Sequence, residues 1–133
     1  MGMKNDAGFS LLELIIYVAI VGIILAVAVP KYNNAIAMAN TARIQADLQA
    51  LDGAIMMYYS ENGTYPTGVG DLTDYVINVD NIQPPKGKCL LRDGSELEIT
   101  ADSYAIDNEE NEALCQGHVL ADFGSQKSKA GGD

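Results

Sequence analysis

The sequence is poor in the residue types on which most enzymes depend. Its 133 residues include no Trp, two Phe, two Cys and a single His. The chain has no phosphate-binding glycine loop, no nucleophile elbow and no metalloprotease helix signature. We therefore expect a protein that is not an enzyme and that has no cofactor.

Positive charge is also scarce. Eight Lys and Arg residues stand against 18 Asp and Glu residues, which gives a formal net charge of −10. Proteins that bind nucleic acid need clustered Lys and Arg, and so do proteins that dock on anionic lipid. The composition argues against direct nucleic-acid binding and against electrostatic attachment to a membrane surface.

Charge of either sign is almost absent from one long segment. Between Phe9 and Val29 the only formally charged side chain is Glu13, and Pro30 follows. A helix of this length is about 30 Å long, close to the hydrocarbon thickness of a bilayer. Residues 9–30 are therefore predicted to form a transmembrane helix. A carboxylate inside such a helix is costly and normally has a dedicated partner.

The segment in front of this helix is short and polar. A secretory signal peptide would end in a small-residue cleavage site after its apolar region, but here Pro30 and Lys31 follow directly. The small residue, Gly8, comes before the apolar run instead. Cleavage there would remove residues 1–8 as a leader and leave Phe9 as the new N-terminus of a retained helix. A plain single-pass anchor with an incidental Glu13 is the simplest alternative.

The stretch Gly8-Phe9-Ser10-Leu11-Leu12-Glu13 resembles the prepilin cleavage and methylation motif of type IV pilins and type II secretion pseudopilins. The resemblance continues in register through Gly22 and Pro30. It implies that a prepilin peptidase cuts after Gly8 and that Phe9 is N-methylated. It also implies that Glu13 accepts the new amine of a neighbouring subunit during assembly.

Electrostatics agrees with the role that the resemblance gives to Glu13. Cleavage creates a cation that assembly would bury among apolar helices, and a buried cation needs an opposite charge. Glu13 is the only candidate in the apolar run. The amine of Phe9 and the carboxylate of Glu13 would lie one helical turn apart, so pairing within one subunit is also open.

Gly22 and Pro30 mark the interval in which the helix should be weakest. Pro30 lacks an amide hydrogen and clashes with the preceding turn, so a kink or local melting is expected near it. Gly22 lowers helix stability by about 1 kcal/mol relative to Ala. In the resembling family this interval is where the helix can lose order inside a filament. Close helix packing in the membrane is an equally good explanation of Gly22.

The helical pattern continues after Pro30 but becomes amphipathic. Apolar side chains recur three or four residues apart, and polar ones, among them Asp47 and Asp52, occupy the opposite face. Asn62-Gly63 is a typical helix end. One helix is predicted from near Phe9 to near Glu61. Its apolar stripe should comprise Tyr32, Ile36, Ala39, Ile44, Leu48, Leu51, Ile55 and Tyr58.

The second half of the chain predicts a small antiparallel sheet packed on this stripe. Asp93-Gly94 is a hairpin signal between two apolar segments. The expected fold is α+β and pilin-like, with a globular head over residues 31–123 and a flexible tail over 124–133. The predicted strands are 89–91, 97–99, 103–106 and 119–123.

Cys89 and Cys115 are predicted to form a disulfide if the head lies in an oxidising compartment. Zinc is the alternative, but with His118 as the lone histidine its ligand set is incomplete. The Asp107–Glu112 stretch is acidic enough to raise the possibility of calcium, although its spacing matches no EF-hand. A solvated acidic loop is the simpler interpretation, and no metal is expected.

The resemblance implies a structural subunit of a type IV pilus. The precursor would be a single-pass protein of the cytoplasmic membrane with its head outside the cytoplasm, and it would then form a helical homo-oligomer at the cell surface. An inner-membrane assembly platform and its ATPase would supply energy, since this chain has no nucleotide motif. One alternative is a pseudopilin of a periplasmic type II secretion filament, which residues 58–66 also resemble. Another is a minor pilin that acts as a membrane-tethered binding module.

Overall fold

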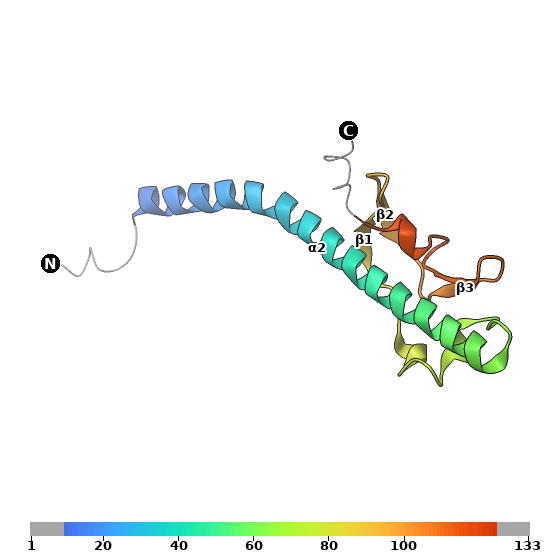
Figure 1. The fold of residues 1–133 in the computed structure, drawn as a ribbon. Helices are drawn as coiled ribbons and strands as arrows, with labels where there is room; N and C mark the ends of the chain where they lie inside the picture. The colour runs from blue at the N-terminus through green and yellow to red at the C-terminus, as the bar shows by residue number, and fades with distance from the viewer. Residues whose placement is uncertain (1–9, 125–133) are drawn as a thin grey trace. The chain divides into compact units, whose positions relative to one another are not determined.

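The computed structural model describes residues 10–124 and shows one long helix followed by a small β-containing head (Figure 1). The helix, α2, spans Leu11–Asn62, close to the predicted range. The chain divides into two compact units, residues 1–35 and 36–133, which are described separately below. The α+β, pilin-like class predicted from the sequence is confirmed.

Helix α2 ends where the sequence predicts. Gly63 has φ +74°, and its amide donates to the carbonyl of Tyr59 at 2.8 Å. This left-handed position is one that glycine adopts without strain, so Asn62-Gly63 closes the helix.

The head contains two separate two-stranded antiparallel sheets. Strand β1 (Gly87–Leu90) pairs with β2 (Glu96–Ile99), and β3 (Ala105–Asp107) pairs with β4 (Glu112–Leu114). The predicted Asp93-Gly94 hairpin is confirmed, with Leu90 opposite Glu96 and Gly94 at φ +94°. Short 3-10 turns lie at Val69–Leu72, Val79–Asn81 and Leu120–Asp122.

The strand predicted over residues 119–123 is wrong. Residues Leu120–Asp122 form a 3-10 turn, and only Phe123 makes a β-bridge, to Leu91. The Asp122 carboxylate accepts the amide of Val119 at 3.1 Å, and this local bond favours a turn over an extended chain. The fourth strand is β4 instead, which begins inside the stretch expected to be an acidic loop.

The core of the head lies on the second half of α2. Ile44, Leu48, Leu51 and Ile55 are fully buried, as the apolar stripe predicts. Each such side chain contributes about 1.5–3 kcal/mol when its surface leaves water. They pack with the buried residues of the strands and turns, which include Leu72, Cys89, Ile99, Tyr104, Ala113, Cys115 and Phe123.

The beginning of the stripe differs from the prediction. Ile36 and Ala39 are exposed, while Ala37 and Thr41 are buried. These small side chains let β1 approach the helix, and the amide of Leu90 donates to the Thr41 hydroxyl at 2.7 Å. Because β1 lies close to α2 here, the face of the helix that is buried carries small side chains.

Two carboxylates that were predicted to face solvent instead attach the head to α2. The Tyr104 hydroxyl donates to Asp47 Oδ2 at 2.6 Å, and the amide of Ala113 donates to Asp52 Oδ1 at 2.7 Å. Burial raises the pKa of Asp52, while the bond from Ala113 opposes that shift. Asp47 and Asp52 therefore lie at the edges of the stripe and bond to the β3–β4 half of the head.

Replacement of Tyr104 by Phe should destabilise the head by about 1–2 kcal/mol at neutral pH, because Asp47 loses its donor at a half-buried site. Burial, followed by the bond to Asp47, raises the pKa of Tyr104 well above its ordinary 10.0. As pH rises above 10, the unfolded chain therefore loses this proton first, and the stability of the wild type should decline there. Urea unfolding of both proteins at neutral and alkaline pH would show a difference that shrinks at high pH. Tyr75→Phe is the control, since Tyr75 makes a similar bond to Glu61 at the exposed surface.

Replacement of Gly53 by Ala should stabilise the head by about 0.5–1 kcal/mol. Gly53 lies inside α2, and a Cβ added there would meet no atom within 4 Å. The matched control is Gly63→Ala, which also meets no atom but forces a side chain into a left-handed position at a cost of about 1 kcal/mol. Thermal unfolding in detergent should move the two midpoints in opposite directions.

Candidate assembly segment

The first part of α2 has no covering within the described chain. All its large apolar side chains from Leu11 to Val29 are exposed, from 47% for Ile16 to 74% for Leu11. By length and composition this part of the helix could cross a membrane. A continuous apolar surface on every side of a helix requires lipid or other apolar helices around it.

Ser10 caps the start of α2. The amide of Glu13 donates to Ser10 Oγ at 3.2 Å, and the amide of Leu14 donates to the Ser10 carbonyl at 3.1 Å. This role was not assigned from the sequence, although Ser followed three residues later by Glu is a recognisable helix-start pattern. The cap fixes the helix start next to the predicted cleavage site.

Glu13 lies in the first turn of α2, where the helix dipole favours a carboxylate. Its side chain is exposed, and within residues 10–124 no hydrogen bond or ion pair reaches the carboxylate. It is thus placed to accept a donor from outside the described chain. Gly8 and Phe9 lie outside the described residues, so cleavage, methylation and the choice between pairing partners stay predictions.

Gly22 and Pro30 both lie inside α2, and the helix continues through Pro30. A Cβ added at Gly22 would meet no atom within 4 Å, so nothing in the described chain requires glycine there. Both explanations of Gly22 therefore concern surroundings outside the single chain, either the membrane or the filament. Loss of helical order between Gly22 and Pro30 in a filament stays a prediction.

Cys89 and Cys115 are both fully buried in the head and are free thiols in the structure. Burial raises the pKa of both, that of Cys115 to about 11, and Cys89 is a further cause of the shift at Cys115. Both residues belong to the same buried core cluster of the head. Their disulfide stays a prediction.

Metal ligands are not assembled in the described part of the chain. Residues 10–124 contain no group of three or more His, Cys, Asp or Glu side chains arranged to hold a metal ion. In the Asp107–Glu112 stretch, Asp107 Oδ1 instead accepts the amides of Glu109 and Glu110, at 2.8 and 3.4 Å. The carboxylate thereby orders the β3–β4 turn, and the calcium possibility stays a prediction.

Known proteins resemble this chain in two ways. The family model described as the prokaryotic N-terminal methylation motif matches residues 3–29. Among curated relatives, the type II secretion system core protein G of Klebsiella pneumoniae is 35% identical over 49% of this chain and 46% of its own length. The core protein G of Klebsiella michiganensis is 27% identical over 80% of this chain and 74% of its own length.

Fimbrial proteins are also similar. The type IV major fimbrial protein FimA of Dichelobacter nodosus is 44% identical over 40% of this chain and 35% of its own length. The chain thus matches about half, or less, of several of these relatives. No solved structure matches it.

The family model covers the segment that carries Gly8, Phe9 and Glu13, at the start of the pilin-like architecture expected from the sequence. The described part of the chain supplies the long apolar helix and the small antiparallel sheets of that architecture. These matches support the resemblance of the chain to type IV pilins and type II secretion pseudopilins.

Proposed function

We propose that this chain is a structural subunit of a type IV pilus, processed after Gly8 and assembled through its N-terminal helix. The observation that carries the proposal is the first half of α2, which is apolar on every side and has one carboxylate, Glu13, in its first turn. Packing such helices against copies of themselves removes their apolar surface from water and lipid together.

The proposed partners are those that cleavage after Gly8 and assembly through the N-terminal helix require. It needs a prepilin peptidase for cleavage and an inner-membrane platform with an ATPase for assembly. Before assembly it is a single-pass protein of the cytoplasmic membrane with its head outside the cytoplasm. Residues 9–30 form the filament core, and residues 31–123 form the head.

A pseudopilus of a type II secretion system is the second candidate. The alignment with the Klebsiella michiganensis core protein G spans 107 residues, or 80% of this chain, whereas the alignment with FimA spans 54 residues. An alignment of 107 residues must include much of the head, and this favours the second candidate. Both candidates use the same helix and the same carboxylate.

One preparation tests both candidates. Filaments sheared from the cell surface are pelleted, and the intact mass of this chain is measured in the pellet and in the membrane fraction. An abundant sheared form that lacks residues 1–8 and carries one extra methyl group supports the pilus. A processed form that stays with the cell envelope supports the pseudopilus. An uncut chain in both fractions would contradict the proposed function.

A further inference from the structure

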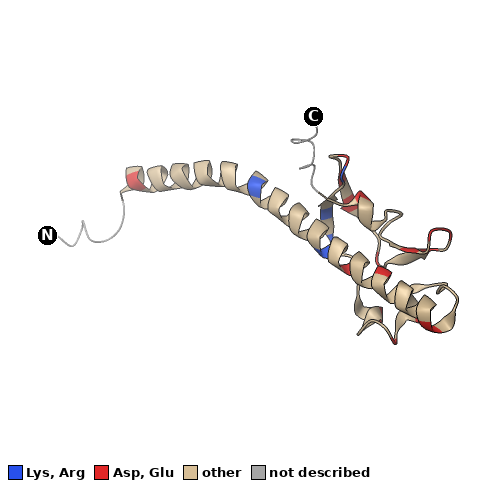
Figure 2. Cartoon of the chain, in the orientation of Figure 1, with Lys and Arg blue, Asp and Glu red and all other residues tan. Residues whose placement is uncertain are grey.

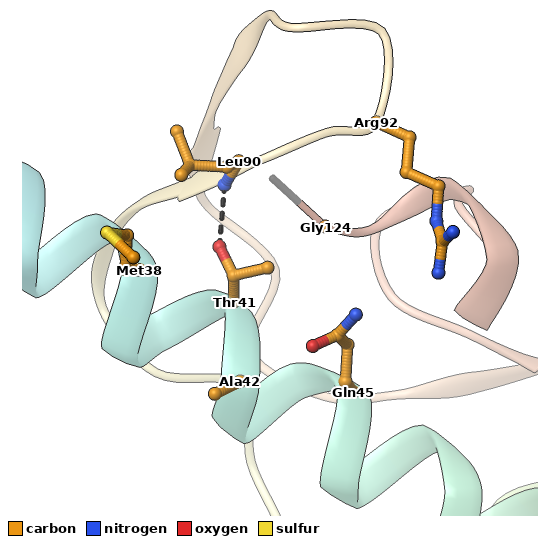
Figure 3. Close-up of a pocket in the computed structure, with 7 residues that line it drawn as sticks. All are labelled: Met38, Thr41, Ala42, Gln45, Leu90, Arg92 and Gly124. Carbon is orange, nitrogen blue, oxygen red and sulfur yellow. Dashed lines mark hydrogen bonds between the residues drawn. The ribbon is translucent and has the colours of Figure 1, made fainter. Parts of the chain in front are cut away.

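A pocket of about 290 Å³ opens on the head between α2 and the end of β1 (Figure 3). Thr41, Ala42 and Gln45 line it from the helix, and Leu90, Arg92 and Gly124 line it from the opposite side. The side chains of Gln45 and Arg92 both bring hydrogen-bond donors to the pocket, so its polar groups favour an occupant that accepts hydrogen bonds.

Arg92 is held in place by its neighbours. Its Nε donates to the carbonyl of Phe123 at 3.1 Å, and Gln45 Nε2 donates to the same carbonyl at 3.0 Å. The stem of Arg92 lies against Gly124, where a Cβ would come within 3.3 Å of Arg92 Cγ. This arrangement uses one of the five guanidinium N–H groups, and within residues 10–124 the other four have no hydrogen-bond partner.

Arg92 also differs from the other cations of residues 36–124. The other three described Lys and Arg side chains of residues 36–124 each have a carboxylate in the same chain: Asp47 for Arg43, Asp102 for Lys86 and Glu96 for Lys88. No described carboxylate pairs with Arg92. In a chain of net charge −10, a positioned guanidinium without an acidic partner marks a site for an external carboxylate.

The β3–β4 turn carries carboxylates of the complementary kind. Glu109, Glu110 and Glu112 are exposed, and none has an ion pair within the described residues. The turn is ordered by the bonds to Asp107 and by the amide of Asn111, which donates to the Asp107 carbonyl at 2.7 Å. Figure 2 shows acidic residues on this turn.

The two surfaces lie at different levels along α2. The pocket is at the level of Thr41, and β4 is attached at Asp52 through Ala113. Eleven residues of helix separate these levels by about 16 Å. Two unlike, complementary surfaces offset along one axis make a head-to-tail contact that repeats from copy to copy instead of closing a dimer.

We propose that the acidic turn of one copy docks on the Arg92 pocket of the next copy in the filament. The proposal rests on the proposed function, since it needs parallel copies displaced along their helices. A helical filament gives each subunit several neighbours at different displacements, so this contact does not have to involve the same neighbour as a contact at Glu13. The chemistry is carboxylate to guanidinium, with Gln45 as a further donor.

Charge exchange in the full-length chain tests the docking. Arg92→Glu should lower the yield of sheared or envelope filaments about tenfold, because like charges then face each other across the contact. The turn variant E110R/E112R should lower the yield similarly. The combined variant R92E/E110R/E112R should recover most of the wild-type yield, since the exchanged charges attract again.

Lys86→Glu is the matched control. It makes the same charge change near β1, but Lys86 pairs with Asp102 of its own chain at 2.7 Å, so filament yield should stay near the wild-type value. Thermal unfolding of each variant shows whether the head is folded. If the wild type makes no filaments, the proposed function fails. If it makes them but the combined variant gives no rescue, the docking fails alone. A chain that ends at Gly124 tests one more alternative. If its filament yield falls as that of Arg92→Glu does, the pocket holds the tail of its own chain, and the proposal is again overturned.

Discussion

Replacement of Glu13 by Ala should reduce the filament yield at least about a hundredfold while leaving cleavage after Gly8 intact. The expected loss comes from the amine that cleavage creates at Phe9. Removing one member of a buried ion pair costs about 3–5 kcal/mol, and every 1.4 kcal/mol corresponds to a factor of ten in an equilibrium constant. A subunit that cannot neutralise this amine should remain in the membrane.

The measurement compares the processed chain in the membrane and filament fractions by intact mass. Glu13→Ala should give a chain that lacks residues 1–8 and is found almost entirely in the membrane. Glu13→Gln is the informative companion, because it keeps the size and one acceptor oxygen but removes the charge. A yield for Glu13→Gln close to that of Glu13→Ala would identify charge, rather than shape, as the requirement.

Glu61→Ala provides the control for loss of an acidic residue from the same helix. Glu61 lies near the other end of α2 and accepts a bond from the exposed Tyr75 hydroxyl. Its loss should leave filament yield near the wild-type value. Normal filament yield from Glu13→Ala would refute the role assigned to that carboxylate, whether the amine belongs to a neighbour or to the same subunit.

The sequence predicts the long helix and the first hairpin because both depend on local signals. The apolar run up to Val29, the three-to-four spacing after it and Asn62-Gly63 together define α2. Asp93-Gly94 defines the β1–β2 turn, because the turn needs the positive φ that Gly94 supplies. Such signals act over a few residues and do not depend on the rest of the fold.

The rest of the head depends on contacts that are distant in sequence. Strand β4 begins in an acidic stretch whose composition favours a loop, and it is fixed by the bond from Ala113 to Asp52, 61 residues away. Asp47 likewise pairs with Tyr104, 57 residues away. Helical periodicity placed both carboxylates on the solvent face because it contains no information about which polar groups the head will offer them.

For the assembly segment, the sequence motif is more informative than the contacts within one chain. The motif predicts Gly8, Phe9 and Glu13 directly, but within residues 10–124 the carboxylate of Glu13 has no donor. The exposed apolar half of α2 and the uncovered carboxylate of Glu13 are incomplete in a monomer. The role of Ser10 depends on a local hydrogen bond at the helix start. The sequence motif was interpreted as a processing site, and this interpretation did not include helix capping.

Replacement of both cysteines should have the second large effect, which is a lower stability of the head. In an oxidising compartment a Cys89–Cys115 bridge would close a loop of about 27 residues, which corresponds to about 3–4 kcal/mol in the chain-entropy account. For a head with a core this small, that is a large part of the total stability. The variant C89A/C115A should therefore unfold at a much lower urea concentration than the oxidised wild type.

Adding a reductant distinguishes stabilisation by a Cys89–Cys115 bridge from stabilisation by the packing of the two side chains. Both sulfurs are fully buried, and burial raises the pKa of both thiols. A reductant should therefore act only as the head opens, and the reduced wild type should then approach the stability of C89A/C115A. Reductant should leave C89A/C115A unchanged. The intact mass of the wild type should be two hydrogens below that of the reduced chain. A wild type at full mass and insensitive to reductant would mean that Cys89 and Cys115 serve as apolar core side chains, and that packing alone holds β1 and the segment after β4 on α2.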